Sequence, residues 1–369
     1  MTTTATTKTL ARSHVPVVQI MTEPDAVWQE TVEALPTSTL AHAPEWLDAI
    51  RNGYGHTPLY LRGEDADGRA GVLPAFVVRR PLLGTVVSSM PFLDTGGPCA
   101  ASPELAHALV AQLVREARQR GARVVELRCT ERLALERPPM ENKVNLALPL
   151  PADPDQLWQR VGGAIRNQIR KAERSGLTVE FGHMEFLAPF YEAFAVRMRD
   201  LGSPVHARGF LAAVLESFGP RARIALVRKG PTPVGGLVAL AHKDSLVIPW
   251  ATCLKEYFAL CPNMLMYWET LRAACREGFR RFDFGRSSRN SGTYQFKRQW
   301  GAHEEPTFWY TLPLAPRRPD VTAAHVSPHA SADAPHNGHG KDLVVKAWQR
   351  LPLSLTRWLG PRLRRYLTQ

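Results

Sequence analysis

The residues best suited to chemistry lie in one stretch of the chain, residues 282–301. It begins with the alternating pattern of a strand end and continues into a turn-rich loop, Gly285 to Gly292. The loop carries a cation and two hydroxyls that we name as candidate substrate-binding residues: Arg286, Ser287 and Ser288. A glycine-rich loop after a strand is a common ligand site in α/β folds, and its free amides and cations would suit a phosphate or a developing oxyanion. A surface loop with solvated cations fits the composition equally well.

The same stretch resembles a motif of the FemAB-like transferases, in the branch associated with exosortase and PEP-CTERM systems. Residues 278–287 follow the pattern G-F-R-x-F-D-F-G-R-S, and residues 292–301 follow G-T-x-x-F-K-x-x-W-G. A weaker resemblance extends from about His42 to Trp309. It implies an α/β fold made of two acetyltransferase-like (GNAT) domains in tandem. It also implies transfer of an acyl or aminoacyl group to an amine.

The resemblance assigns the transfer step to the lysine of the F-K pair, which is Lys297 here. We expect its ammonium at the exposed mouth of a cleft between the domains, where it would meet the carbonyl oxygen as charge develops. Asp94, in the turn of residues 94–98, is a second catalytic candidate that would orient the acceptor amine or take its proton. A simple turn-forming role fits Asp94 as well. Phe296 and Trp300 complete the motif as candidate substrate-binding aromatics.

A basic helix predicted within residues 153–176 is a further candidate binding surface. Its sequence RNQIRKAERSG resembles the family signature R-x-x-I-R-K-A-x-x-S-G. The resemblance implies that this face binds an anionic donor or acceptor, with three candidate residues: Arg166, Arg170 and Lys171. The alternative is an ordinary solvated helix face.

The net charge and the cysteine content limit the possible binding partners and cofactors only in part. The formal net charge of +12 favours anionic partners without choosing among nucleic acid, phosphorylated precursors and membrane surfaces. The five cysteines form no C-x-x-C pair, so we expect reduced thiols, no metal site and no bound cofactor. Aminoacyl-tRNA is the donor that the family resemblance implies. Acyl-CoA is the alternative, although the second half has no match to the R/Q-x-x-G-x-G/A turn that holds its pyrophosphate.

The order hairpin, strand, helix, strand occurs twice and predicts two mixed α/β domains. We expect a disordered stretch at residues 1–15, a first GNAT-like domain at 16–151 and a second at 152–312. A flexible linker follows at 313–341, and a basic amphipathic segment at 342–369. Pro352 and Pro361 are expected to break that segment into short helices.

The sequence shows no secretion signal and no apolar run of the ~20 residues that span a bilayer, so we expect a cytoplasmic protein. The basic segment at 342–369 either contacts the inner face of an anionic membrane or packs onto the first domain.

The expected activity is Fem-like amide formation on an amine of a cell-envelope or exopolysaccharide-related acceptor. The alternatives are an acyl-CoA-dependent N-acyltransferase and a non-catalytic assembly factor of the exosortase or exopolysaccharide system.

Overall fold

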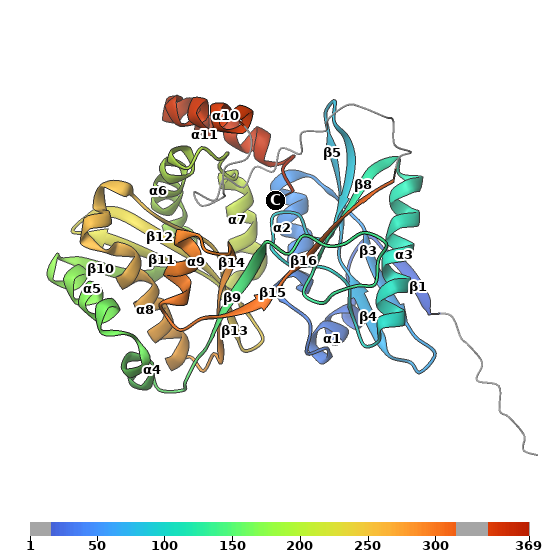
Figure 1. Ribbon diagram of the computed structural model, residues 1–369, viewed down its shortest axis with the longest axis horizontal. Helices are drawn as coiled ribbons and strands as arrows, with labels where there is room; N and C mark the ends of the chain where they lie inside the picture. Colours follow the sequence, from blue (N-terminus) through green and yellow to red (C-terminus); the bar gives the residue numbers. More distant parts are fainter. Residues whose placement is uncertain (1–15, 315–338, 369) are drawn as a thin grey trace, which may run out of the picture.

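The computed structural model describes residues 16–314 and 339–368, and its strands form three sheets (Figure 1). The predicted disordered stretch at 1–15 and most of the predicted linker lie outside the described residues. Two of the sheets make up the first unit. One has the order β1 (Val17–Met21), β3 (Tyr60–Glu64), β4 (Ala70–Leu73) and β7 (Cys99–Ala100). The other has the order β16 (Phe308–Pro313), β8 (Ala122–Cys129), β6 (Gly84–Ser88), β5 (Phe76–Arg80) and β2 (Thr57–Pro58).

Helix α3 (Pro103–Gln119) packs against strands of both sheets and shows how local sequence fixes this unit. Ser102 caps it by accepting the amide hydrogen of Leu105, and Pro103 occupies the first turn. Leu105, Leu109 and Leu113 recur every four residues and are fully buried. Two shorter helices, α1 (Ala26–Ala34) and α2 (Trp46–Tyr54), belong to the same unit.

The second unit is built on a seven-stranded sheet. Its order is β10 (Leu177–Gly182), β11 (Ala222–Lys229), β12 (Thr232–His242), β13 (Ser245–Cys253), β14 (Arg281–Ser288), β9 (Lys143–Pro149) and β15 (His303–Pro306). Helices α4 (Pro154–Arg160), α5 (Gly163–Arg174) and α8 (Pro262–Arg276) pack together, and α8 covers β10 to β13. Helix α6 (Leu187–Asp200) packs on β11 to β13, and α7 (Arg208–Phe218) packs on α6 and β11. The mixed α/β class expected from the sequence is confirmed.

Two strands cross the boundary that the sequence places near residue 151. β9 precedes it but pairs with β14 and β15 of the seven-stranded sheet, whereas β16 returns to pair with β8 of the first unit. Residues 144–148 of β9 are all buried, and the strand lies inside the seven-stranded sheet between β14 and β15. Residues 303–313 therefore form two strands that belong to two different sheets.

The units also share a hydrophobic core. Trp46 of α2 packs edge-on against Phe218 of α7, at 5.0 Å between ring centroids, and Tyr54 stacks on Phe210 at 4.7 Å. These side chains belong to one buried cluster that continues into α6 through Phe190. The two units therefore pack as one body around a common apolar interior.

The basic segment folds as α10 (His339–Arg350) and α11 (Leu353–Arg364), and both pack on α6 of the second unit. Pro352 separates the helices as expected, but α11 continues through Pro361, so the break predicted at that position was wrong. Beyond α11, Thr368 reaches the first unit, where its carbonyl accepts the amide hydrogen of Phe92. No helix among the described residues combines the length and apolarity that crossing a bilayer requires.

Candidate active site

Lys297 lies in a short helix, α9 (Gly292–Arg298), which the sequence pattern did not predict. β14 continues through Ser288, so half of the expected loop is strand. Ser291 then starts the helix, because its side chain accepts the amide hydrogen of Tyr294 at 3.1 Å. The helix packs back on β14 and directs Lys297 toward that strand.

Lys297 is buried, with 8% of its surface exposed, so the expectation of an exposed ammonium was wrong. Its Nζ donates to the backbone carbonyls of Gly285 at 3.0 Å and Arg286 at 3.1 Å. Burial lowers the pKa of Lys297 to about 8, and the carboxylates of Asp94 and Asp283 limit the fall. An ammonium has three protons, so these two bonds leave one for a ligand.

Asp94 reaches the same place from the first unit, on the segment between β6 and β7. One carboxylate oxygen accepts from Nε of Arg286 at 3.0 Å, and the other accepts from the Arg286 amide at 3.3 Å. Burial opposes ionisation, but the Arg286 guanidinium and amide outweigh it and hold the pKa of Asp94 below its usual range. Because 41% of the side chain is exposed, an ionised carboxylate faces solvent here.

Gly285 lies between the two candidate catalytic groups. Its φ of +76° is a conformation that side chains rarely adopt. A Cβ built at this position would lie 3.6 Å from Oδ2 of Asp94 and 4.0 Å from Nζ of Lys297. The structure therefore brings Lys297 and Asp94 together over Gly285, although they come from different units and are 203 positions apart in the sequence.

The neighbouring strands separate at this point. β13 and β14 run parallel, but they pair only from Ser245 to Val247 on β13 and from Arg281 to Asp283 on β14. Pro249, which has no amide hydrogen to donate, follows shortly after the last pair. The carbonyl oxygen of Ile248 would lie 3.5 Å from a Cβ at Gly285. The divergence thus frees backbone groups of β13 beside Lys297 and Asp94.

Arg286 does not present the free guanidinium expected of an anion-binding loop residue. Only 7% of its side chain is exposed, it pairs with Asp94, and its guanidinium lies 3.4 Å from the ring centroid of Trp309. Trp309 in turn donates from Nε1 to the backbone carbonyl of Asp94 at 3.0 Å. We therefore replace the predicted anion-binding role of Arg286 with one of holding the Asp94 carboxylate.

Sequence reasoning missed three further residues around the site. Trp309 is one, and the buried Arg128 is another: its guanidinium also lies over Trp309 and donates to the carbonyls of Met90 and Leu93. Lys143 on β9 is the third, and burial together with Arg286 lowers its pKa to about 8. Lys143 reaches the site because β9 pairs with β14, which places Lys143 opposite Ser288. No local sequence pattern predicts that pairing.

The other predicted binding residues do not join Lys297 and Asp94. Phe296 and Trp300 pack in the core with Tyr267. Ser287 and Ser288 are buried on β14, and the Ser287 hydroxyl has no partner among the described residues.

The basic helix is separate from the site as well. Helix α5 contacts β10, which lies four strands from β14, or roughly 19 Å at the usual strand spacing. Within α5, Arg166 donates to the carbonyl of Val161 at 2.6 Å, and Arg170 lies over Trp158. Lys171 is exposed.

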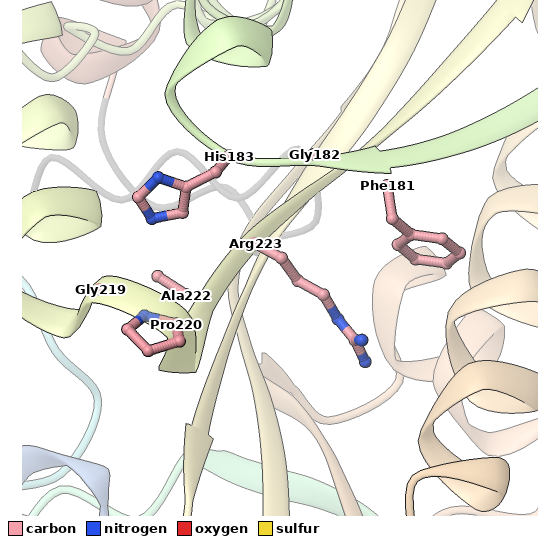
Figure 2. A pocket seen from close by; sticks show the side chains of 7 residues that line it. All are labelled: Phe181, Gly182, His183, Gly219, Pro220, Ala222 and Arg223. Carbon is pink, nitrogen blue, oxygen red and sulfur yellow. The ribbon is translucent and has the colours of Figure 1, made fainter.

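A surface hollow lies elsewhere, between the end of β10 and the start of β11 (Figure 2). Phe181 and Arg223 flank one side, and the other carries His183 and Pro220. None of the predicted site residues lines it, and β11 is three strands away from β14. The candidate active site is therefore the group around Gly285.

Comparison with known proteins finds a family match within the second unit. Residues 160–298 match the acetyltransferase (GNAT) domain family, and this range includes β13, β14 and Lys297. A search by sequence among curated proteins finds no match. Among solved structures, FemX superposes with a TM-score of 0.61 at 14% identity, over 80% of this chain and 97% of FemX.

Two further structures share the fold. A tandem GNAT protein from the clavulanic acid biosynthesis pathway has a TM-score of 0.52 at 10% identity, over 82% of this chain and all of that one. A protein of unknown function from Bacteroides thetaiotaomicron has a TM-score of 0.53 at 10% identity, over 80% and 100%. Residues 160–298 thus match an acetyltransferase (GNAT) domain, and the chain as a whole shares the fold of FemX and of a tandem GNAT protein.

Proposed function

We propose that this protein is a Fem-like N-acyltransferase that forms an amide on an amine acceptor. The observation that carries the proposal is the meeting of Lys297 and Asp94 over Gly285, where β13 and β14 diverge. A buried cation and an ionised carboxylate open to solvent suit the two charges that develop in acyl transfer, negative on the carbonyl oxygen and positive on the attacking amine nitrogen.

Lys297 serves the donor carbonyl. The acceptor nitrogen attacks that carbon, a C–N bond forms, and the bond to the leaving ester oxygen or thioester sulfur breaks. Two protons of Lys297 are held by backbone carbonyls, so the third remains for the developing oxyanion of the proposed reaction. Because the folded backbone already holds the Lys297 ammonium in place, this hydrogen-bond donor does not have to reorganise during the reaction. Its interaction therefore stabilises the transition state more than the ground state.

Asp94 serves the acceptor. A carboxylate whose pKa lies below its usual range is a weak base at neutral pH, so it suits orientation of the amine better than removal of its proton. Arg286 and Trp309 hold the carboxylate and its backbone in place. The amine proton then passes to the leaving group or to solvent.

The donor we propose is aminoacyl-tRNA, on the strength of the Fem-like motif around Lys297 and the net charge of +12. The divergence of β13 and β14 favours acyl-CoA as a second candidate, because it frees backbone groups that could bond an extended thioester arm. The acceptor we propose is an amine of a cell-envelope or exopolysaccharide precursor, which rests on the resemblance to the exosortase-associated branch.

The test is single-turnover transfer from labelled aminoacyl-tRNA or labelled acyl-CoA to amino-sugar and peptide amines. Lys297→Met should lower turnover by roughly two to three orders of magnitude, the scale of losing one oxyanion donor, while donor binding changes far less. Lys229→Met, which removes an exposed lysine on β11, is the matched control and should transfer normally. Thermal unfolding of both variants checks that the fold survives.

Unchanged turnover in Lys297→Met would remove this mechanism. If neither donor is used, and Lys297→Met still complements a deletion strain, the protein is an assembly factor that keeps only the fold.

A further inference from the structure

Helix α11 turns an apolar stripe toward solvent. Leu355, Trp358 and Leu363 are 39%, 57% and 40% exposed, and their spacing places them on one side of the helix. The opposite side is fixed to the protein: Gly360 is buried against Val205, and the buried Arg364 side chain bonds His206. The stripe is therefore held outward by a well-packed inner face.

The same segment is strongly basic. Residues 343–368 contain six lysines and arginines and no aspartate or glutamate. Arg357 is paired with Glu192 of α6, but Lys346, Arg350 and Arg362 are exposed. The Arg362 guanidinium lies 4.2 Å from the ring centroid of Trp358, which places a cation directly beside the most exposed aromatic of the stripe.

A second exposed apolar group lies on the turn between β5 and β6. Leu82 is fully exposed and has a φ of +64°, an unusual conformation for leucine, and Leu83 is 70% exposed. Arg79 and Arg123 are exposed beside this turn. In Figure 1 the tip of β5 and the pair α10–α11 both reach the upper edge of the molecule, and Arg80 of β5 donates to the hydroxyl of Thr368, just beyond α11, at 3.1 Å.

We propose that these two elements form a single face that binds the surface of a bilayer rich in anionic lipid. The basic apolar face consists of Leu82, Leu83, Leu355, Trp358, Arg362 and Leu363. Leucine and tryptophan side chains would enter the boundary between headgroups and acyl chains, while the surrounding cations attract the anionic headgroups. Charge complementarity alone would also admit RNA, but protein surfaces that bind nucleic acid are predominantly polar, and this face exposes large apolar side chains.

The inference is independent of acyl transfer, because none of these residues belongs to the Lys297 and Asp94 site. Binding to the bilayer would combine an apolar and an electrostatic contribution. Removing either the exposed apolar side chains or the exposed cations should therefore weaken it. Salt should weaken it as well, because ions screen exposed charges beyond about 8 Å at physiological strength.

The experiment is co-sedimentation of the full chain with vesicles of phosphatidylcholine, with and without about one third phosphatidylglycerol. The wild type should sediment with the anionic vesicles only, and less at high salt. Trp358→Ala, and separately Leu82→Ser with Leu83→Ser, should each weaken binding by about tenfold. Arg362→Gln should flatten the salt dependence. Val27→Ser, an exposed apolar residue of α1, is the matched control and should bind as the wild type.

Three outcomes would overturn the proposal. The first is equal sedimentation with neutral and anionic vesicles, or none with either. The second is binding that Trp358→Ala and the Leu82 and Leu83 double variant leave unchanged. The third is that vesicles do not bind while light scattering shows a dimer, or gel shift an RNA complex, that these variants disrupt. Circular dichroism melts of each variant separate loss of binding from loss of fold.

Discussion

At the scale of single residues, the site depends on a cation that the fold buries but does not neutralise. Lys297 loses hydration, which lowers its pKa to about 8, and two nearby carboxylates keep it from falling further. At neutral pH most of the population is therefore protonated, whereas one unit above pH 8 most of it is not. The availability of a proton donor at this position should change within the working range of an enzyme.

The transfer rate should consequently fall as pH rises through about 8, because deprotonation of Lys297 removes the donor for the oxyanion. The acceptor amine must lose its proton before it can attack, so at lower pH the transfer rate should rise with pH. Lys297→Arg should move the falling limb to higher pH, since guanidinium stays protonated. Single-turnover rates across pH 6 to about 10, with one acceptor throughout, measure this.

Lys143 also has its pKa lowered to about 8, so Lys143→Arg is the necessary comparison. If the falling limb moves in Lys143→Arg and stays in place in Lys297→Arg, the proton donor has been assigned to the wrong lysine.

At the scale of elements, the site lies where β13 and β14 part and where Gly285 lets the two catalytic candidates approach. A methyl group at Gly285 would make ordinary van der Waals contacts with Asp94 and Lys297, and it would fill the space between them. The positive φ adds strain of about 1 kcal/mol. The effect of filling this space can be separated from the effect of backbone strain by a second glycine. Gly278 has a similar φ of +85°, but a Cβ built there would have nothing within 4 Å.

Gly285→Ala should therefore reduce transfer far more than Gly278→Ala, while both lower the melting temperature by a similar few degrees. Single-turnover transfer and calorimetry on the two variants test this. Equal activity in the two variants would show that the space over Gly285 is not where the substrates meet.

Local pattern was enough to predict some of these elements. The leucine spacing and Ser102 of α3 are local, so the sequence predicts that helix closely. The Fem-like motif also led to Lys297. Helix α9 was missed because seven residues beginning Gly-Thr-Tyr have little helix preference, and only the Ser291 cap and packing on β14 stabilise it.

The rest of the site depends on contacts between distant parts of the chain. Arg286 looked free because its partners are distant in the sequence: Asp94 lies on the segment between β6 and β7, and Trp309 lies on β16. Lys143 looked remote because its place depends on which strand β9 pairs with. Burial of Lys297 follows from the same nonlocal packing, since periodicity does not report which strand will cover a helix.

At the scale of the whole molecule, the two units exchange strands. β9 comes from the first half of the chain but pairs with β14 in the seven-stranded sheet. β16 comes from the second half but pairs with β8 in the five-stranded sheet. One hydrophobic cluster also extends through both units. The seven-stranded sheet contains a strand from the first half of the chain, and the five-stranded sheet contains a strand from the second half, which predicts cooperative unfolding.

A fragment of residues 152–313 should accordingly fail to fold, because it lacks the strand that lies between β14 and β15. Adding residues 140–151 should restore part of the sheet. Circular dichroism and amide hydrogen exchange on both fragments, compared with the single unfolding transition expected of the full chain, test this. A stable 152–313 fragment, or two separate transitions in the full chain, would show that the exchanged strands contribute little.

The exchange of β9 also has a consequence for synthesis on the ribosome. Asn145 of β9 bonds Asp283 of β14, a partner 138 residues later in the chain. At the usual rates of elongation, that partner emerges roughly 7–28 s after β9. During that interval a strand whose central residues are all buried in the finished protein has neither of its neighbours. Such a nascent chain offers an open apolar edge to other chains, so the yield of this protein in cells should depend on a holding chaperone more than its final stability would suggest.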